Sequence, residues 1–193
     1  NTVLGGSGTD SITASGGNNS INAGEDNDTI TAISGTNTIN AGDGNDTIRL
    51  NNGTNSLVAG SGADTITAAS GFNTIDAGDD ADTITLTGGN NTVLGSSGND
   101  TITASGGTNT IATGEGDNTI VLNDGDNSVT ASSGNDAITA AGGHNTIDAG
   151  GGNDTIRLND GTNSLVAGSG MDSITAASGF NTIDAGDDAD SIT

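Results

Sequence analysis

The feature that most constrains this chain is a nine-residue repeat that runs through all 193 residues without an insertion or deletion. Residues 41–58 hold two successive copies, AGDGNDTIR and LNNGTNSLV. Both copies have Gly at the fourth place and an apolar residue at the eighth, but the sixth place is Asp46 in the first and Asn55 in the second. A fixed short period is typical of solenoids, in which stacked coils bury a continuous core between neighbours. The repeat therefore predicts a solenoid rather than an ordinary globular core.

The sixth place divides the nonapeptides into two alternating sets. One set has Asp at ten of its eleven sixth places, and the exception is Asn118. These aspartates are Asp10, Asp28, Asp46, Asp64, Asp82, Asp100, Asp136, Asp154, Asp172 and Asp190. The other set has Asn at all eleven, from Asn1 to Asn181. The true period is therefore eighteen residues, and each coil has two unlike sides.

The period also predicts the secondary structure, because nine residues leave no room for a helix between strands. Triplets around the eighth place, such as Thr47-Ile48-Arg49, are rich in β-branched residues and alternate outward and inward. The six residues before each triplet supply the Gly and Asn that tight turns require. We therefore predict an all-β fold for residues 1–193, a single parallel β-roll or β-solenoid of about eleven 18-residue coils. By parity, Ile48 and Leu50 should point into the core.

The chain begins inside a nonapeptide and has no atypical coil at either end. Solenoids normally need polar capping coils. We therefore expect residues 1–193 to be an uncapped excerpt of a longer repeat array.

Composition excludes several classes of function. With 25 acidic and 2 basic residues the net charge is -23, which disfavours nucleic acid and anionic membranes and favours cations. No apolar run approaches 20 residues, so no membrane insertion is expected. The single histidine, His144, is expected at an exposed turn without a second ligand, so no catalytic triad can be assembled and no enzyme is predicted.

The sixth place shares the inward parity of the eighth, so the aspartates should form a partly buried column. Carboxylates stacked at roughly the 4.8 Å strand spacing would suffer desolvation and mutual repulsion. Ca²⁺, a hard cation that prefers oxygen ligands, would relieve both. The ten aspartates are therefore the predicted calcium ligands. The alternative is that each carboxylate only accepts hydrogen bonds from its own turn.

The asparagines on the opposite side carry no charge and can both donate and accept hydrogen bonds. Stacked amides can form a ladder without metal, which is the structure predicted for this side. Calcium binding through amide and carbonyl oxygens is the alternative.

Motifs such as Gly5-Gly6-Ser7-Gly8-Thr9-Asp10-Ser11-Ile12-Thr13 resemble the RTX nonapeptide GGxGxDxUx, and the resemblance covers the whole chain. It implies a parallel β-roll with calcium held between successive turns by the Asp carboxylates and turn carbonyls. It also implies an extracellular or bacterial cell-surface location, as in giant adhesins and S-layer proteins. The chain departs from the pattern at its Asn-side turns, at Asn118, and where Asp26, Asp80 and Asp188 replace the fourth-place Gly.

These observations predict a secreted, calcium-binding structural or spacer segment of a large surface protein, such as an adhesin, S-layer protein or matrix filament. Calcium would fold and stiffen it, and other copies of the chain are further candidate partners, end to end or laterally. One alternative is an ice-binding solenoid that uses outward Thr-x-Thr pairs such as Thr65/Thr67, in a row broken by Arg49, Val121, Ala137 and Arg157. Another is a metal-free self-assembling fibre held by Asn and Asp ladders.

Overall fold

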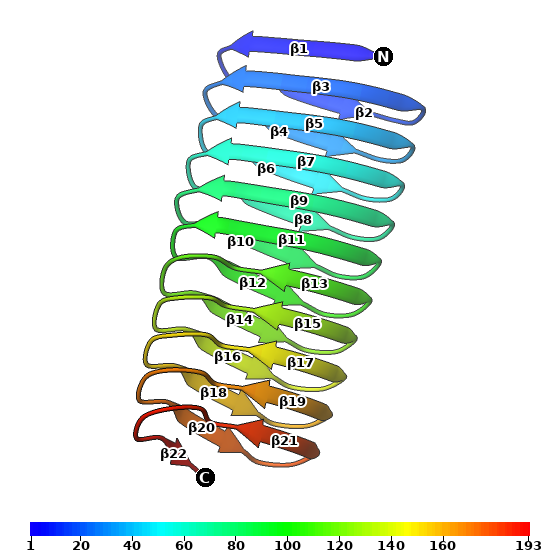
Figure 1. Ribbon diagram of the computed structural model, residues 1–193. Helices are drawn as coiled ribbons and strands as arrows, with labels where there is room; N and C mark the ends of the chain where they lie inside the picture. The colour runs from blue at the N-terminus through cyan, green and yellow to red at the C-terminus, as the bar shows by residue number, and fades with distance from the viewer.

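The protein is a parallel β-solenoid of eleven coils, described for residues 1–193 by a computed structural model (Figure 1). Each coil contributes one strand to each of two eleven-stranded sheets, so the odd-numbered strands stack in one sheet and the even-numbered strands in the other. We call these the odd sheet and the even sheet. The structure contains no helix of the length and apolarity needed to cross a membrane. The predicted all-β solenoid of 18-residue coils is confirmed.

The strands of the odd sheet extend to eight residues in the N-terminal half and shorten after residue 97. They are β1 (Thr2–Ser7), β3 (Asn18–Glu25), β5 (Thr36–Asp43), β7 (Thr54–Ser61), β9 (Phe72–Asp79), β11 (Asn90–Ser97), β13 (Thr108–Ala112), β15 (Asp126–Thr130), β17 (His144–Asp148), β19 (Thr162–Val166) and β21 (Phe180–Asp184).

The strands of the even sheet are shorter and nearly uniform. They are β2 (Ser11–Ala14), β4 (Thr29–Ala32), β6 (Thr47–Leu50), β8 (Thr65–Ala68), β10 (Thr83–Leu86), β12 (Thr101–Ala104), β14 (Thr119–Leu122), β16 (Ala137–Ala140), β18 (Thr155–Leu158), β20 (Ser173–Ala176) and β22 (Ser191–Ile192).

The register between coils is eighteen residues throughout, so each residue pairs with the residue at the same place in the next coil. In the even sheet Ile84 pairs with Ile102, and in the odd sheet Ile39 pairs with Leu57. The stacked coils are joined by parallel ladders of backbone hydrogen bonds. A residue type that recurs at one place of the repeat therefore forms a continuous row along the rod.

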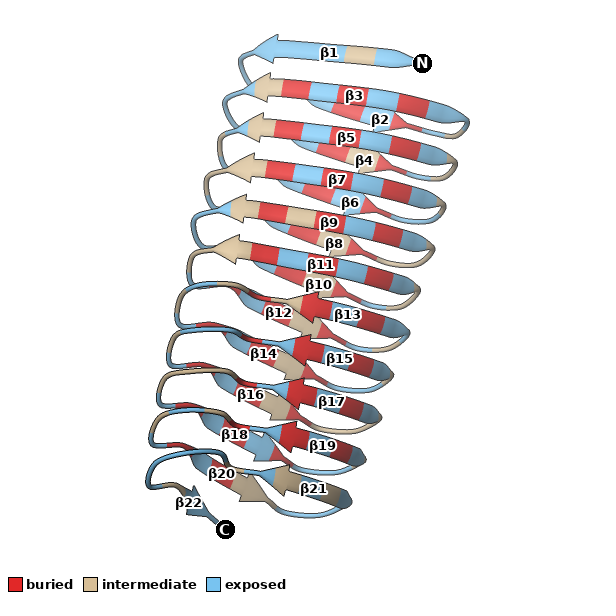
Figure 2. Ribbon diagram, viewed as in Figure 1, coloured by how far each residue is buried: buried red, intermediate tan, exposed pale blue.

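The core lies between the two sheets, as the alternation of buried and exposed residues along the inner strands shows (Figure 2). Ile48 and Leu50 are fully buried, which confirms the parity prediction. Small residues such as Ala41 fill the space beside the turns. Each fully buried Ile or Leu contributes about 1.5–3 kcal/mol through the hydrophobic effect, and the 35 buried hydrophobic residues form one cluster along the rod.

The Asp-side turns depend on backbone with positive φ at their second and fourth places, whereas the Asn-side turns have it at the fourth place alone. Gly60, at a second place, has a φ of +121°, and a Cβ there would lie 1.9 Å from the carbonyl oxygen of Gly42 in the preceding coil. Asp80 stands where most turns have a fourth-place Gly and keeps a φ of 79°. Aspartate tolerates this region better than most residues. The turn therefore keeps its geometry at the departures from the Gly pattern.

Several strands are longer than the predicted triplets. In β5 and β7 the pairing continues into the Asp-side turn, where Gly42 pairs with Gly60 and Asp43 with Ser61. The sequence pattern could not indicate this, because Gly-rich segments are ordinarily strand breakers. The close approach of stacked glycines is what allows the backbones to pair there.

Candidate metal centre

The ten predicted calcium ligands lie in one column, which we call the aspartate column, along the turns that lead into the even sheet. Eight of them are buried, and Asp10 and Asp190, in the two terminal coils, are partly buried. The buried members are Asp28, Asp46, Asp64, Asp82, Asp100, Asp136, Asp154 and Asp172. Asn118 occupies the same place in its coil and is equally buried. The inward orientation predicted by parity is confirmed.

One oxygen of each inner carboxylate is used by the protein itself. The backbone N–H of Asp46 donates to Oδ1 of Asp64 at 2.7 Å, and the N–H of Asp64 donates to Oδ1 of Asp82 at 2.8 Å. The pattern continues through all eleven turns, including the bond from the Asn118 N–H to Oδ1 of Asp136. The predicted alternative, in which each carboxylate accepts from its own turn, is wrong, because the donor belongs to the preceding coil.

The other carboxylate oxygen, Oδ2, has no hydrogen-bond partner. This holds for Asp10, Asp28, Asp46, Asp64, Asp82, Asp100, Asp136, Asp154 and Asp172. A buried, unsatisfied polar atom costs about 1–3 kcal/mol, and more when it is charged. Nine such atoms in one row are unusual for a native fold, in which buried polar groups are normally paired. Hydrogen bonds within the protein therefore do not account for these nine Oδ2 atoms, which remain available to an external ligand.

Burial disfavours the ionised form of these carboxylates. Desolvation raises the pKa of Asp64 and of Asp82 to about 7, and that of Asp154 to about 6. A backbone hydrogen bond from the preceding coil lowers each pKa, and neighbouring carboxylates, including Asp80 for the first two, raise it. Desolvation likewise raises the pKa of Asp46, Asp100 and Asp136. A divalent cation bound to the carboxylates would offset both the desolvation of their charged form and the repulsion between neighbouring carboxylates.

The donor set fits calcium in an arrangement shared between coils. No group of three or more His, Cys, Asp or Glu side chains converges on one point. An ion on the column would therefore take Oδ2 atoms from successive coils together with turn carbonyl oxygens. All of these are oxygen ligands, the type that Ca²⁺ prefers, and Ca²⁺ tolerates irregular geometry.

Three turns carry a second carboxylate at the fourth place. Oδ2 of Asp26 accepts from the N–H of Gly8 at 3.0 Å, and Oδ2 of Asp80 accepts from the N–H of Gly62 at 3.2 Å. Asp188 accepts in the same way from Gly170. These carboxylates are exposed, so they add negative charge beside the column without adding to its buried row.

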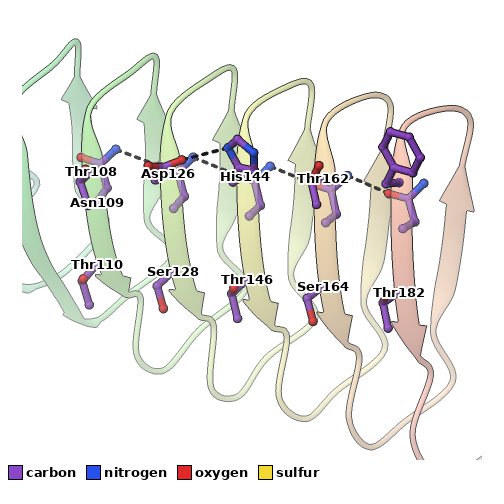
Figure 3. Close-up of a pocket in the computed structure, with 15 residues that line it drawn as sticks. Thr108, Asn109, Thr110, Asp126, Ser128, His144, Thr146, Thr162, Ser164 and Thr182 are labelled. Carbon is purple, nitrogen blue, oxygen red and sulfur yellow. Dashed lines mark hydrogen bonds and ion pairs between the residues drawn. The ribbon is translucent and has the colours of Figure 1, made fainter.

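The opposite edge carries the predicted amide ladder. Nδ2 of Asn91 donates to Oδ1 of Asn109 at 2.7 Å, and Nδ2 of Asn109 donates to Oδ1 of Asn127 at 2.8 Å. Ten such bonds connect Asn1 to Asn181 without a break, and part of the row is drawn with dashed lines in Figure 3. Most of these amides also donate to the carbonyl oxygen three residues earlier, as Asn91 does to Gly88. This edge satisfies its polar groups without a metal.

The outward face of the odd sheet carries a second row of hydroxyl groups, which was not predicted from the sequence. A shallow groove lies there, and hydroxyl groups of Thr110, Ser128, Thr146, Ser164 and Thr182 follow one another along it (Figure 3). The seventh place of the Asn-side repeat is Ser or Thr in all eleven coils, and every one is exposed. We call these residues the hydroxyl row. Its regularity is visible in the sequence, and unlike the Thr-x-Thr pairs of the even sheet it is not interrupted.

His144 is exposed, as expected, but it has an acidic neighbour that was not expected. Its Nδ1 lies 3.1 Å from Oδ1 of Asp126, the residue at the same place in the preceding coil, and this contact is an ion pair only when the ring is protonated. The two residues are eighteen apart, so the period itself could have located the contact. Both side chains are exposed, which makes the pair a surface contact rather than a buried site.

Comparison with known proteins agrees with this geometry. A family model described as the RTX calcium-binding nonapeptide repeat matches residues 4–32, 31–66, 58–93, 85–120, 121–156 and 166–193. No curated protein matches the chain significantly. Among solved structures, a hyperactive, Ca²⁺-dependent, β-helical antifreeze protein from an Antarctic bacterium aligns with a TM-score of 0.61 and 20% sequence identity. The alignment covers 95% of this chain and 83% of that one. At this identity the likeness concerns the fold alone.

Proposed function

Because the chain belongs to the RTX calcium-binding nonapeptide repeat family, we propose that it is a structural segment that Ca²⁺ stiffens through the aspartate column. The observation that carries the proposal is the row of nine buried Oδ2 atoms without partners. Each would become a calcium ligand, and the ion would supply the positive charge that the buried carboxylates lack. The proposed ligands are the ten aspartates predicted from the sequence.

The proposed role is mechanical and extracellular. A chain with a net charge of -23 repels itself when it is unfolded, and calcium would neutralise much of that repulsion as coils form. Each coil advances the rod by roughly 4.8 Å, so the segment acts as a spacer of defined length. We place it in a large secreted surface protein, such as an adhesin, an S-layer protein or a matrix filament.

Circular dichroism and thermal unfolding of the purified chain, with calcium and with EGTA, test the proposal. Calcium should raise the melting temperature, while the amide ladder and the backbone ladders retain part of the β signal in EGTA. Magnesium serves as the matched cation, because its strict octahedral geometry suits a backbone-lined site poorly. Spectra and melting temperatures that are identical under all three conditions would leave the metal-free fibre as the better account.

Ice binding is the second candidate, favoured by the hydroxyl row. A straight, exposed row of hydroxyls at one spacing is a repetitive surface, and the solved structure with a similar fold is an antifreeze protein. Thermal hysteresis of the calcium-loaded chain tests it. Replacing Thr110 and Thr146 with Tyr should abolish any hysteresis if the row is the ice-binding face, whereas the same change at Thr65 and Thr67 of the even sheet should not.

Lateral association is the proposed contact between copies of the chain. Apolar side chains are exposed on the odd sheet, among them Val58, Phe72 and Leu94. Sedimentation velocity with and without calcium tests this point, because neutralising the aspartate column should lower the repulsion between copies. A monomer at every calcium and protein concentration would argue against it.

A further inference from the structure

The turn at residues 113–118 differs from every other turn of the aspartate column. Its last two residues are Asp117-Asn118, whereas the flanking turns end in Asn99-Asp100 and Asn135-Asp136. The same two residue types are present in exchanged order. The exchange adds no charge and moves one carboxylate from the inward sixth place to the outward fifth place; the turn also contains Glu115, which is exposed.

The buried amide of Asn118 is satisfied by the protein. Its Nδ2 donates to the carbonyl oxygen of Gly116 at 2.9 Å, so the place where the aspartates have an unpartnered Oδ2 holds a donor with a partner. Its Oδ1 accepts from the N–H of Asp100 at 2.9 Å, which continues the ladder between coils. Asn118 therefore preserves the bond between coils, but it lacks the buried, unpartnered carboxylate oxygen that would bind a cation.

The carboxylate of Asp117, at the outward fifth place, also has hydrogen-bond partners. Oδ1 of Asp117 accepts from the backbone N–H of Asn135 at 2.6 Å and from its Nδ2 at 3.2 Å. Asn99 holds the same outward place one coil earlier and accepts from the N–H of Asp117 at 2.9 Å. Asp117 thus takes the bonding role of the outward fifth place, which is Asn in five of the eleven coils, and it does not replace the missing inward ligand.

We infer that the turn at residues 113–118 is a built-in metal-free joint that divides the calcium array into two separate blocks. The inference rests on the proposed calcium function. Eleven turns leave ten gaps, and Asn118 borders two of them. The first block has five gaps between the six aspartates from Asp10 to Asp100, and the second has three gaps between the four aspartates from Asp136 to Asp190. The joint is the only turn that would have no ion on either side.

The amide replaces the cation at the joint because it brings its own hydrogen-bond donor. An ionised carboxylate can only accept, whereas an amide accepts with one atom and donates with the other. The coil at the joint is therefore held in the same way with and without calcium. The two blocks on either side should gain order independently when calcium enters, because no ion bridges the joint.

Counting bound ions by native mass spectrometry of the whole chain tests the inference. The double variant D117N/N118D restores the order of the flanking turns at unchanged net charge and should bind two more calcium ions than the natural chain. The control N99D adds a carboxylate at the outward place and should add none. Equal counts for the natural chain and the double variant would overturn the inference, whereas a natural chain that binds no calcium would overturn the proposed function itself.

Hydrogen–deuterium exchange of the natural chain is a second test that needs no variant. Calcium should slow exchange at the turns of residues 96–100 and 132–136 and leave the turn of residues 114–118 nearly unchanged. Equal slowing at all three turns would contradict a metal-free joint even if the double variant failed to fold.

Discussion

The backbone N–H of Asp46 donates to Oδ1 of Asp64, one coil further along the chain, at 2.7 Å. This bond holds the carboxylate of Asp64 in place between two coils and leaves its second oxygen without a partner. The acidic residue is therefore oriented by the fold before any ion is present. Preorganised ligands of this kind reduce the ordering cost that binding would otherwise carry.

The buried carboxylates give opposite pH dependences with and without calcium. The pKa of Asp64 and of Asp82 is raised from 3.8 to about 7, with Asp46, Asp80 and Asp100 as their acidic neighbours. Between these pKa values the folded chain holds protons that the unfolded chain releases, so the calcium-free fold should lose stability as pH rises through that window. With saturating calcium it should gain stability, because protons compete with the ion. Melting temperatures across the window, in calcium-depleted and calcium-containing buffers, check both signs.

Asp82→Asn should change stability in opposite directions under the two conditions. In EGTA the variant should be more stable by about 1 kcal/mol or more, because a buried unsatisfied oxygen is replaced by an amide. In calcium it should be less stable than the natural chain, because a ligand has been removed. Asp148→Asn is the matched control, since Asp148 is exposed on the odd sheet and the substitution changes net charge equally. A shift of the same sign in both buffers would contradict the proposed ligand role.

Asn91→Asp should weaken the fold in a way that calcium does not repair. The change removes the donor to Oδ1 of Asn109 and to the carbonyl oxygen of Gly88, and it buries a charge. We expect a loss of about 1–3 kcal/mol in the free energy of unfolding, measured by denaturant titration. Asn90→Asp, at the exposed neighbouring position, is the control and should be nearly neutral. Full rescue by calcium would instead indicate that the amide edge also accepts the ion.

Gly60→Ala should disrupt the turn between β7 and β8. Its φ of +121° disfavours a side chain, and the new Cβ would meet the carbonyl oxygen of Gly42. The backbone conformation alone costs about 1–2 kcal/mol, and the collision adds to it. Gly106→Ala is the matched control, because Gly106 does not have a positive φ and its nearest neighbour to a Cβ is the carbonyl oxygen of Thr87 at 3.8 Å. Equal melting temperatures for the two variants would contradict the strain argument.

The period and its parity were sufficient to predict the solenoid, the inward direction of Asp46 and the amide ladder through Asn55. They were not sufficient to predict which N–H reaches each carboxylate. That choice depends on the stagger between coils and on side-chain rotamers, and only the packed structure sets these. The pair of His144 with Asp126 was missed for a different reason. The two residues are far apart along the chain, and only the 18-residue period brings them together in neighbouring coils.

The two edges of each coil are set by different chemistry. The amide edge is bonded from coil to coil through side chains, as from Asn91 to Asn109. The aspartate edge is bonded through backbone N–H groups to Oδ1 atoms and also carries unpaired Oδ2 atoms. Any change of coil spacing confined to the aspartate edge cannot lengthen the rod evenly and must curve it instead, as a strip of two unlike layers curves when one layer contracts. Such a change would therefore alter the direction in which the segment points more than it would alter its length.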